Sequence, residues 1–383
     1  MKKVLIVTAL AGFINTFLLN DIEEYKKRGY EVHCAANNNF LAGDNVLTYL
    51  EPMGVKFYDL EFNSKKPLSI KNFKLFKKIK RLLKKEQYNI IHCHTPIPGL
   101  YVRLAAKKLR KKGTKVIYTT HGLSFNKYSS RKNKLIYKFI ESYLSRITDH
   151  IICINHEDYN ELIKMKCENV HYLPSVGFDF NKYYSENNNI KIDEYRSSIG
   201  VSKEKIMVLS VGELSSRKNH QIIIKAISLL ENHSDYVYVI CGREILGSGT
   251  KDYLIKLSKD LDVNLILLGH RKDIPQIMKC SDIGAIPSIR EGFGMAGVQS
   301  LAAGVPLVGS DIQGIKDYIV NEETGYLSSP FDEVSFAKNI EKLSDFSLRN
   351  EMKANCINMA RKYDKCISYK KMEEIIDLIV GEK

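Results

Sequence analysis

Several hallmarks of large protein classes are missing from this sequence of 383 residues. No apolar run reaches the roughly 18 residues that a membrane-spanning helix needs, which argues against a spanning segment within the chain. No H-x-x-x-H motif and no cysteine cluster is present, so the sequence predicts no metal site and no cofactor. The dinucleotide fingerprint G-x-G-x-x-G is also absent, because "TALAGFINTF" after the first expected strand contains a single glycine.

The cysteines and the N-terminus both favour a cytoplasmic protein. None of the eight cysteines forms a C-x-x-C pair, and Cys93, Cys153 and Cys241 lie in or beside apolar strand-like runs, as reduced core thiols do. The opening "MKKVLIVTALAG" resembles a short signal peptide, but its apolar core runs directly into an amphipathic helical pattern. We therefore interpret it as a first β-strand.

Acidic residues are scarce in the first half of the chain. The net charge is +14 at neutral pH, and residues 1–180 carry 31 Lys and Arg against 16 Asp and Glu. The remaining residues carry 27 and 28, so essentially all of the excess lies in the first half. This asymmetry predicts a surface that faces something anionic.

Short β-branched runs alternate with longer amphipathic ones, a pattern typical of parallel sheets with helices on both faces. The chain is also longer than one hydrophobic core usually serves. The expected strands of the first half are 3–8, 31–35, 55–58, 90–93, 116–119, 150–153 and 170–172. The rhythm stops in a polar stretch and restarts with strands at 206–211, 237–241, 265–268, 283–286 and 307–308.

These patterns predict an α/β fold with two Rossmann-like domains. We expect an N-terminal domain at 1–175, a linker at 176–204 and a C-terminal domain at 205–364. In parallel sheets, ligands bind beyond the carboxyl ends of the strands, so the residues there are the candidates for function.

Two strand ends of the second half carry such candidates. Arg217 and Lys218 open a helix after the restarted first strand, and two cations at a helix N-terminus form a natural diphosphate site. Glu291 precedes "GFG" at the next helix, where Gly292 and Gly294 allow a ligand to approach the backbone closely. A solvated basic pair and a helix-capping acid remain alternative interpretations.

In the first half, Gly12 follows the first strand, His94 and Thr95 follow "NIIHC", and His121 follows "VIYTT". Each histidine is either a ligand-contacting group or a partly buried imidazole at a strand end.

Taken together, these residues match the pattern of a known family. The chain resembles the retaining glycosyltransferases of family 4, particularly those that build capsular polysaccharides and exopolysaccharides. The resemblance is carried by "IIHCHTP", "VIYTTHG", "LSRITDHIICINHEDY", "VGELSSRKNHQ", "LLGHRKDIP" and "PSIREGFGMAGVQSLAAGVPLV". It implies the GT-B fold, in which two Rossmann-like domains face a central cleft and a C-terminal helix, here 365–383, crosses back to the first domain.

The resemblance also implies roles for single residues. Catalysis is assigned to Glu291 and His121, and acceptor binding in the cleft to His94 and Thr95. The diphosphate of a nucleotide-sugar donor would contact Arg217, Lys218 and Gly12. The donor sugar would contact Glu291, Gly292 and His121, and the backbone N–H groups of Phe293 and Gly294 would meet the sugar and the phosphate. The nucleoside would contact Arg271 and Gln299.

Gln299 departs from the family pattern, which usually has a second glutamate at this position, eight residues after the first. A neutral acceptor contributes about 0.5–1.5 kcal/mol to a hydrogen bond and a charged one about 1.5–3. The glutamine in place of glutamate is therefore expected to weaken donor binding by about 1 kcal/mol, which is less than tenfold in affinity.

By this resemblance the protein is a metal-independent, retaining hexosyltransferase. It would move a hexose or N-acetylhexosamine from a nucleotide-diphosphate sugar, with UDP expected, to a polyprenyl-diphosphate-linked saccharide in bacterial surface polysaccharide synthesis. The acceptor oxygen attacks from the front face, and the leaving diphosphate takes its proton.

The excess charge has a candidate location in "KKPLSIKNFKLFKKIKRLLKKE". Apolar residues recur there at helical spacing, which predicts that Ile70, Phe73, Phe76, Ile79, Leu82 and Leu83 form a core-facing stripe. The cations of this basic helix are expected to attract an anionic membrane. They include Lys71, Lys74, Lys77, Lys78, Arg81, Lys84 and Lys85. The expected location is therefore peripheral, on the inner face of the cell membrane.

Two other functions remain open on the sequence alone. A nucleotide-sugar 2-epimerase also uses two such domains. The basic half would suit a nucleic-acid-binding protein, but it lacks interleaved aromatic stacking residues, so no nucleic-acid partner is expected.

Overall fold

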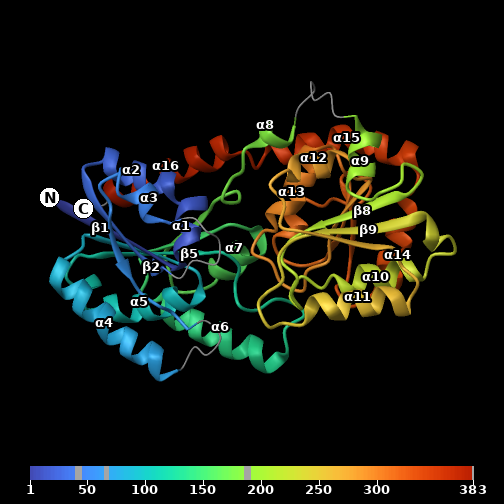
Figure 1. Ribbon diagram of the computed structural model, residues 1–383. Coiled ribbons are helices and arrows are strands. Elements are labelled where there is room, and N and C mark those ends of the chain that lie inside the picture. The colour runs from blue at the N-terminus through green and yellow to red at the C-terminus, as the bar shows by residue number, and fades with distance from the viewer. Residues whose placement is uncertain (39–44, 64–68, 185–190, 382–383) are drawn as a thin grey trace. The chain divides into compact units, whose positions relative to one another are not determined.

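The computed structural model describes residues 1–38, 45–63, 69–184 and 191–381. They form two compact units: Met1–Gly177 with Cys366–Lys383 is unit 1, and Phe178–Lys365 is unit 2. Each unit is a parallel sheet with helices on both faces (Figure 1). Within the described residues, no helix is both long enough and apolar enough to cross a membrane.

Unit 1 is built on a seven-stranded sheet in the order β3-β2-β1-β4-β5-β6-β7. The strands are β1 (Lys2–Leu10), β2 (Tyr30–Asn37), β3 (Lys56–Asp59), β4 (Ile90–His94), β5 (Lys115–Thr120), β6 (His150–Cys153) and β7 (Asn169–Tyr172). Its helices are α1 (Ala11–Phe17), α2 (Leu19–Lys27), α3 (Leu47–Leu50), α4 (Ile70–Glu86), α5 (Pro96–Arg110), α6 (Arg131–Ser145), α7 (His156–Leu162) and α16 (Lys365–Gly381). In Figure 1, α1, α2 and α16 lie on one face of this sheet, and α4 and α5 lie on the other.

The C-terminal helix packs on the first unit, as the family resemblance implies. Asp377 of α16 pairs with Arg28 after α2, at 2.6 Å, and the hydroxyl of Ser368 donates to the carbonyl of Pro174 at 2.7 Å. The α16 residues Met372, Ile375, Ile376 and Ile379 are buried. This confirms the prediction that the C-terminal helix crosses back to the N-terminal domain.

Unit 2 is built on a six-stranded sheet in the order β10-β9-β8-β11-β12-β13. The strands are β8 (Ile206–Val211), β9 (Tyr236–Cys241), β10 (Leu265–Gly269), β11 (Ile283–Ile286), β12 (Leu307–Ser310) and β13 (Gly325–Ser328). Its helices are α8 (Phe180–Tyr183), α9 (Ile192–Ser198), α10 (Gln221–Ser228), α11 (Thr250–Asp260), α12 (Ile274–Lys279), α13 (Met295–Ala302), α14 (Glu333–Lys342) and α15 (Phe346–Arg361). Helices α10, α11 and α14 cover one face, and α12, α13 and α15 cover the other (Figure 1).

Two features of unit 2 differ from the sequence-based expectation. The last strand, β13, was not predicted because "GYLS" has none of the β-branched residues that mark a strand. The expected linker at 176–204 contains α8 and α9, and Arg196 of α9 is buried against Asp282 with an N–O distance of 3.1 Å. The described residues of this segment therefore include two short helices that belong to unit 2, and positions 185–190 of the predicted linker lie outside the described residues.

The strand order places a topological switch point in each unit. In unit 1 the order reverses between β1 and β4, which are paired at Val7 and Cys93. In unit 2 it reverses between β8 and β11, which are paired at Val208 and Ile283. Ligands of open parallel sheets bind at these points, beyond the carboxyl ends of the strands.

Candidate functional site

An ion cluster occupies the switch point of unit 2. Lys218 follows β8 and Glu291 follows β11, and the Lys218 ammonium lies 2.5 Å from Oε1 of Glu291. The guanidinium of Arg217 lies 3.2 Å from the same oxygen, and the hydroxyl of Ser288 donates to it at 2.8 Å. Three residues predicted to bind the donor therefore meet across the two strands.

The charges of this cluster hold one another ionised. Glu291 is only 8% exposed, and burial alone would raise the pKa of its carboxyl. The cationic side chains of Lys218 and Arg217 outweigh that effect, so the pKa of Glu291 lies below its ordinary value. For Arg217, burial would lower the pKa, but the carboxylates of Glu291 and Glu213 raise it above its usual range. The acid is therefore a carboxylate at neutral pH.

Glycine lets the lysine lie across the end of β8. A Cβ at Gly212 would be 3.0 Å from Cε of Lys218, and a Cβ at Gly242 would be 1.7 Å from the carbonyl oxygen of Gly212. A side chain at Gly212 would crowd Lys218, and one at Gly242 would separate the ends of β8 and β9. The close approach of the chain at these two positions thus sets the position of the ammonium.

The Gly292–Gly294 turn is fixed from behind by aromatic side chains. Phe293 is 3% exposed and its ring lies 5.3 Å from the ring of Tyr318. The Tyr318 hydroxyl donates to the carbonyl of Gly294 at 3.0 Å, and Gly294 has φ +81° immediately before α13. A Cβ at Gly314 would lie 2.5 Å from the carbonyl oxygen of Gly292.

The side chain of Phe293 belongs to the core, so only its backbone is available to a ligand. The family resemblance assigns the backbone N–H groups of Phe293 and Gly294 to the sugar and the phosphate. The main-chain N–H groups of Phe293 and Gly294 donate to no other group among the residues the structure describes. Donors at the start of a helix are suited to an anion or a polar sugar oxygen.

Neither of the predicted nucleoside contacts, Arg271 and Gln299, forms an ion pair with Glu291 among the described residues. Arg271 follows β10 and makes two bonds to Asp273, at 2.9 and 2.5 Å. The Arg271 guanidinium lowers the pKa of Asp273 to about 2, with a further hydrogen bond from the Tyr195 hydroxyl at 2.5 Å. Gln299 is half-buried on α13, and its amide has no hydrogen-bond partner within the described part of the chain.

The switch point of unit 1 holds the predicted histidines. His94 ends β4 and His121 follows β5, and Nδ1 of His94 lies 3.2 Å from Nε2 of His121. The ring of Phe13, beside Gly12, packs edge-on against His121 with centroids 4.7 Å apart. A Cβ at Gly12 would meet no atom within 4 Å. Among the residues of unit 1 that the structure describes, none therefore occupies the space beside Gly12.

The imidazoles of this group are neutral at physiological pH. Burial lowers the pKa of His121 to about 3. Burial, together with the neighbouring His92 and His121, takes the pKa of His94 well below its ordinary value. A neutral His121 can accept or donate one hydrogen bond, but it is not a general acid at pH 7.

Thr95 is conformationally unusual. It has φ +65°, a left-handed conformation that is costly for a β-branched residue, and its hydroxyl is buried without a hydrogen-bond partner among the described residues. Strain of this kind clusters at functional sites, where the surrounding structure holds it in place.

Sequence reasoning missed a buried acid beside these histidines. Asp21 of α2 and the histidines His92 and His94 of β4 offer ligand atoms within 4.8 Å of one another, and all three residues are buried. Asp21 lies in an amphipathic helical pattern beside the acids Glu23 and Glu24, so no spacing in the sequence distinguished it. This is the one group of three potential metal ligands that the described residues contain.

The basic helix α4 differs from its expected packing. Leu75, Ile79, Leu82 and Leu83 are buried, but Ile70 is 77% exposed and Phe73 is 59% exposed. The predicted apolar stripe therefore leaves the core at the N-terminal end of the helix, because the chain there extends past the sheet. Lys71 pairs with Glu61 at 2.5 Å, and Lys78 donates to the carbonyl of Asp59 at 2.7 Å.

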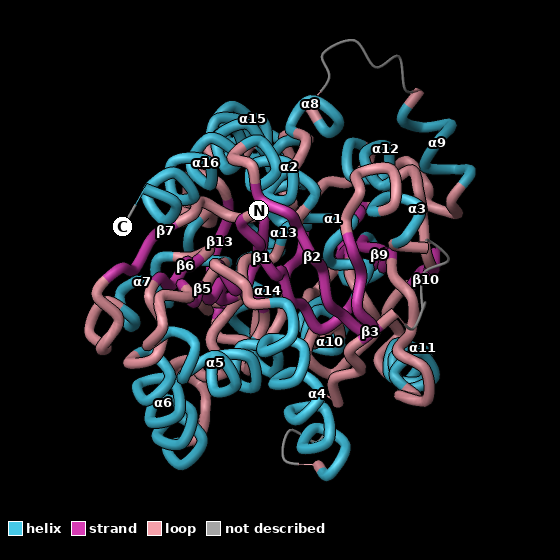
Figure 2. The backbone as a smooth tube through the Cα atoms, turned by 90° about the vertical axis from the view of Figure 1, so that its left-hand side faces the viewer, coloured by secondary structure: helices cyan, strands magenta, loops and turns pink. Residues whose placement is uncertain are grey.

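The other predicted membrane-facing cations of α4 make no ion pair with any described carboxylate. These are Lys74, Lys77, Arg81, Lys84 and Lys85. Figures 1 and 2 show α4 and α6 on either side of α5, on the same face of the unit 1 sheet. Helix α6 adds the exposed apolar residues Leu135 (70% exposed) and Phe139 (76% exposed) to this face.

Comparison with known proteins agrees with this architecture. The family model described as glycosyl transferases group 1 matches residues 191–363, and the glycosyl transferase 4-like model matches residues 3–155. Together they cover most of both units.

Two characterised relatives align over most of the chain. The UDP-Gal:alpha-D-GlcNAc-diphosphoundecaprenol alpha-1,3-galactosyltransferase of Escherichia coli is 32% identical over 296 residues, covering 76% of this chain and 75% of that protein. The capsular polysaccharide biosynthesis glycosyltransferase CapM of Staphylococcus aureus is 24% identical over 378 residues, covering 94% and 93%.

Solved structures share the fold at lower identity. HepE of Anabaena in complex with UDP-glucose has a TM-score of 0.76 at 19% identity, over 99% of this chain and 100% of that one. WaaG, a glycosyltransferase involved in lipopolysaccharide biosynthesis, has a TM-score of 0.72 at 16% identity, over 100% of both chains. By its family models and its relatives, the chain belongs to family 4 of the glycosyltransferases, which have the GT-B fold.

Proposed function

We propose that the protein is a retaining glycosyltransferase that moves a hexose or N-acetylhexosamine from a UDP-sugar to a polyprenyl-diphosphate-linked saccharide in surface polysaccharide synthesis. The observation that carries the proposal is the cluster of Arg217, Lys218 and Glu291 at the switch point of unit 2. The Escherichia coli relative, named for UDP-Gal and a diphosphoundecaprenol acceptor, supports the choice of donor and acceptor.

The donor diphosphate would bind the two cations and the free N–H groups of the glycine turn. Arg217 and Lys218 neutralise phosphate charge, and the N–H groups of Phe293 and Gly294 donate to no competing acceptor among the described residues. In the free protein Glu291 pairs with both cations, and Glu213 also pairs with Arg217. We infer that a bound diphosphate shares them, which leaves a Glu291 oxygen available to a sugar hydroxyl.

The proposed chemistry needs positive charge where the leaving group develops negative charge. The bond between C1 of the sugar and the diphosphate oxygen breaks, and a bond from C1 to the acceptor oxygen forms on the same face. The acceptor proton passes to the diphosphate oxygen. Arg217 and Lys218 stabilise the growing charge on the diphosphate, so the proposed step requires no divalent ion.

The remaining predicted residues keep the roles that the family resemblance implies. We assign His121 to the donor sugar, Gly12 to the diphosphate, and His94 with Thr95 to the acceptor. We assign Arg271 and Gln299 to the nucleoside. The neutral state of His121 agrees with a hydrogen-bonding role.

We further propose that unit 1 docks on the anionic inner face of the cell membrane through α4 and α6. The exposed Phe73, Leu135 and Phe139 would enter the headgroup region, and unpaired lysines would contribute about 1 kcal/mol each near the surface. Flotation with phosphatidylglycerol vesicles tests this. Replacing Lys74, Lys77 and Lys84 of α4 by Gln should weaken binding strongly, while replacing Lys251, Lys256 and Lys259 of α11 should leave it unchanged. Equal effects of the two triple variants would contradict membrane docking through α4.

A panel of nucleotide sugars tests the donor. We expect UDP-sugars to raise the Tm of the full chain, because a ligand at 100 times its Kd stabilises by about 2.7 kcal/mol. Lys218→Ala should remove the shift. Product NMR should show that the new linkage keeps the anomeric configuration of the donor, and inversion would rule out the retaining mechanism. A panel without any shift would contradict the donor assignment.

A further inference from the structure

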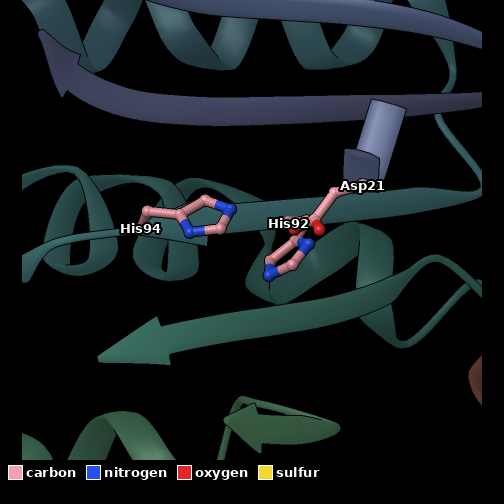
Figure 3. Close-up of side chains that lie close together, drawn as sticks. All are labelled: Asp21, His92 and His94. Carbon is pink, nitrogen blue, oxygen red and sulfur yellow. The ribbon is translucent and has the colours of Figure 1, made fainter. Parts of the chain in front are cut away.

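A buried acid and two histidines converge in unit 1, on the face of the sheet covered by α2. Asp21 reaches from α2 toward the ring of His92 on β4, and His94 lies farther along the same strand (Figure 3). Side chains two positions apart on a strand point to the same side of the sheet, so both rings can face α2. The three residues are 4%, 0% and 1% exposed.

Two polar atoms of this cluster lack partners. Oδ2 of Asp21 and Nε2 of His94 are buried and make no hydrogen bond to any group that the structure describes. A buried carboxylate with no cation beside it is costly, and proteins usually satisfy such a group with a partner or a metal ion. The cluster is therefore incomplete as it stands.

The contacts of the His92 and His94 rings indicate which nitrogen of each ring is available to a metal ion. Nε2 of His92 lies 2.7 Å from the hydroxyl of Thr119, which is a close contact. Nδ1 of His92 lies 3.4 Å from the hydroxyl of Tyr25, which is long for a hydrogen bond. Tyr25 and Asp21 are four residues apart on α2, so Nδ1 faces the helix that carries the acid.

On His94 the available nitrogen is Nε2, whereas on His92 it is Nδ1. Nδ1 of His94 faces Nε2 of His121 at 3.2 Å, which leaves the unpartnered Nε2 as the free nitrogen. If each engaged nitrogen carries the proton, the other nitrogen of each ring has an unshared electron pair. Thr119 and His121 then hold the rings as outer partners of metal-bound histidines do.

We propose that Asp21, His92 and His94 bind a divalent first-row transition metal ion through a carboxylate oxygen, Nδ1 of His92 and Nε2 of His94. Two imidazoles and one carboxylate are ligands that Zn²⁺ and its neighbours accept. Ligand atoms about 2.1 Å from a tetrahedral ion lie about 3.4 Å apart. The ligand atoms of the three residues lie within 4.8 Å of one another, so binding would draw them together by up to about 1.4 Å.

The ion takes no part in the bonds made and broken in the proposed transfer, but it fixes His94 and His121, to which the proposed function assigns the acceptor and the donor sugar. It neutralises Asp21 and, through the Nδ1–H of His94, orients His121 at the switch point. All of the residues involved lie in unit 1.

Zn²⁺ binding to the full chain tests the proposal. After treatment with a chelator, equilibrium dialysis against Zn²⁺ with elemental analysis should give one tightly bound ion per chain. Asp21→Asn and His94→Gln should each weaken binding by more than the roughly 10–100-fold that outer-shell changes cause. His171→Gln is the matched control, because His150 and His171 form a similar histidine pair with a 3.2 Å contact and belong to no described three-ligand group.

Equal Zn²⁺ affinity in the wild type and in both cluster variants would overturn the proposal. If the variants fail to fold, Co²⁺ substitution of the wild-type protein decides instead. We expect the visible bands of a Co²⁺ ion held by nitrogen and oxygen ligands, and their absence would refute the site. Zn²⁺ should also raise the Tm of the wild type and of His171→Gln. The absence of a Tm shift in the wild type would equally contradict the proposed metal site.

Discussion

The substitution Glu291→Gln separates two roles that the ion cluster combines. It keeps the shape of the side chain and its hydrogen bond from Ser288, but it removes the negative charge that faces Lys218 and Arg217 at 2.5 and 3.2 Å. The variant therefore asks whether the carboxylate is needed for the reaction or only for neutralising its neighbours.

The expected loss of stability is modest. A hydrogen bond to a charged group contributes about 1.5–3 kcal/mol and a neutral one about 0.5–1.5, so the free energy of unfolding should fall by about 1–2 kcal/mol. For a unit of this size that corresponds to a decrease in Tm of about 2–8 °C. The protein should remain folded at room temperature.

The effects on binding and turnover should have opposite signs. Lys218 and Arg217 are no longer shared with a carboxylate, so UDP should bind as tightly as before, or up to about tenfold more tightly. The sugar loses a charged acceptor, and a misplaced sugar costs about 100-fold in rate. We expect kcat to fall by at least about that factor. Calorimetry with UDP and a steady-state assay of sugar transfer measure the two effects.

Glu213→Gln is the matched control. Glu213 also pairs with Arg217, at 3.0 Å, but its side chain is 39% exposed and it does not contact Lys218. A surface pair contributes about 0.2–1 kcal/mol, so this variant should differ little from the wild type. Near-normal turnover in Glu291→Gln would refute the assignment of the acid to the donor sugar. A parallel loss of UDP affinity would refute the charge-sharing argument.

The pH dependence of stability gives a second test of Glu291. Its pKa is lower in the folded protein than in the unfolded chain, so its stabilising contribution is complete above the ordinary value near 4.5 and is lost as the pH falls through the lowered value. The difference in unfolding free energy between the wild type and Glu291→Gln should be constant from pH 8 to about 5 and should shrink in more acidic solution. A difference that persists unchanged to pH 3 would contradict the predicted direction.

Three further substitutions probe the surrounding residues. Lys218→Ala should lower kcat/KM by about 10²–10³-fold in a transfer assay while circular dichroism shows a folded protein, and near-normal turnover would exclude Lys218 from the site. Gln299→Glu should tighten donor binding by less than about tenfold in calorimetry if it reaches the ribose, and an unchanged Kd would assign the ribose to other groups. Gly314→Ala should destabilise the protein by about 1–3 kcal/mol and reduce turnover, because its φ is +79° and the new Cβ would press on Gly292 and Phe293. Wild-type melting and turnover in this last variant would show that the glycine turn tolerates displacement.

Much of the fold follows from the sequence because hydrophobic periodicity is a local signal. The alternation of strands and helices predicted two parallel sheets, and the rule about strand ends led directly to Lys218 and Glu291. The same rule could not supply Ser288 or Tyr318, because ordinary residue types do not reveal which neighbours they meet. The short β13 was missed because pairing with β12, and not strand propensity, decides its structure.

The surroundings of individual side chains were the feature hardest to predict from the sequence. The family pattern concerns only the backbone N–H of Phe293, so it did not reveal that the Phe293 ring packs against Tyr318 in the core. The helical periodicity of α4 predicted that Ile70 and Phe73 face the core, but both side chains are exposed. Asp21 comes near His92 only through the tertiary fold, so no spacing in the chain announces the cluster.

Acceptor-dependent release of UDP tests the central claim most directly. The purified protein would be incubated with UDP-sugars, with and without a polyprenyl-diphosphate-linked saccharide, and both free UDP and the extended lipid would be quantified. We predict that UDP appears in step with the extended lipid and only when the acceptor is present. Acceptor-independent interconversion of two UDP-sugars, or no turnover of any UDP-sugar in the presence of such an acceptor, would contradict the proposed transfer.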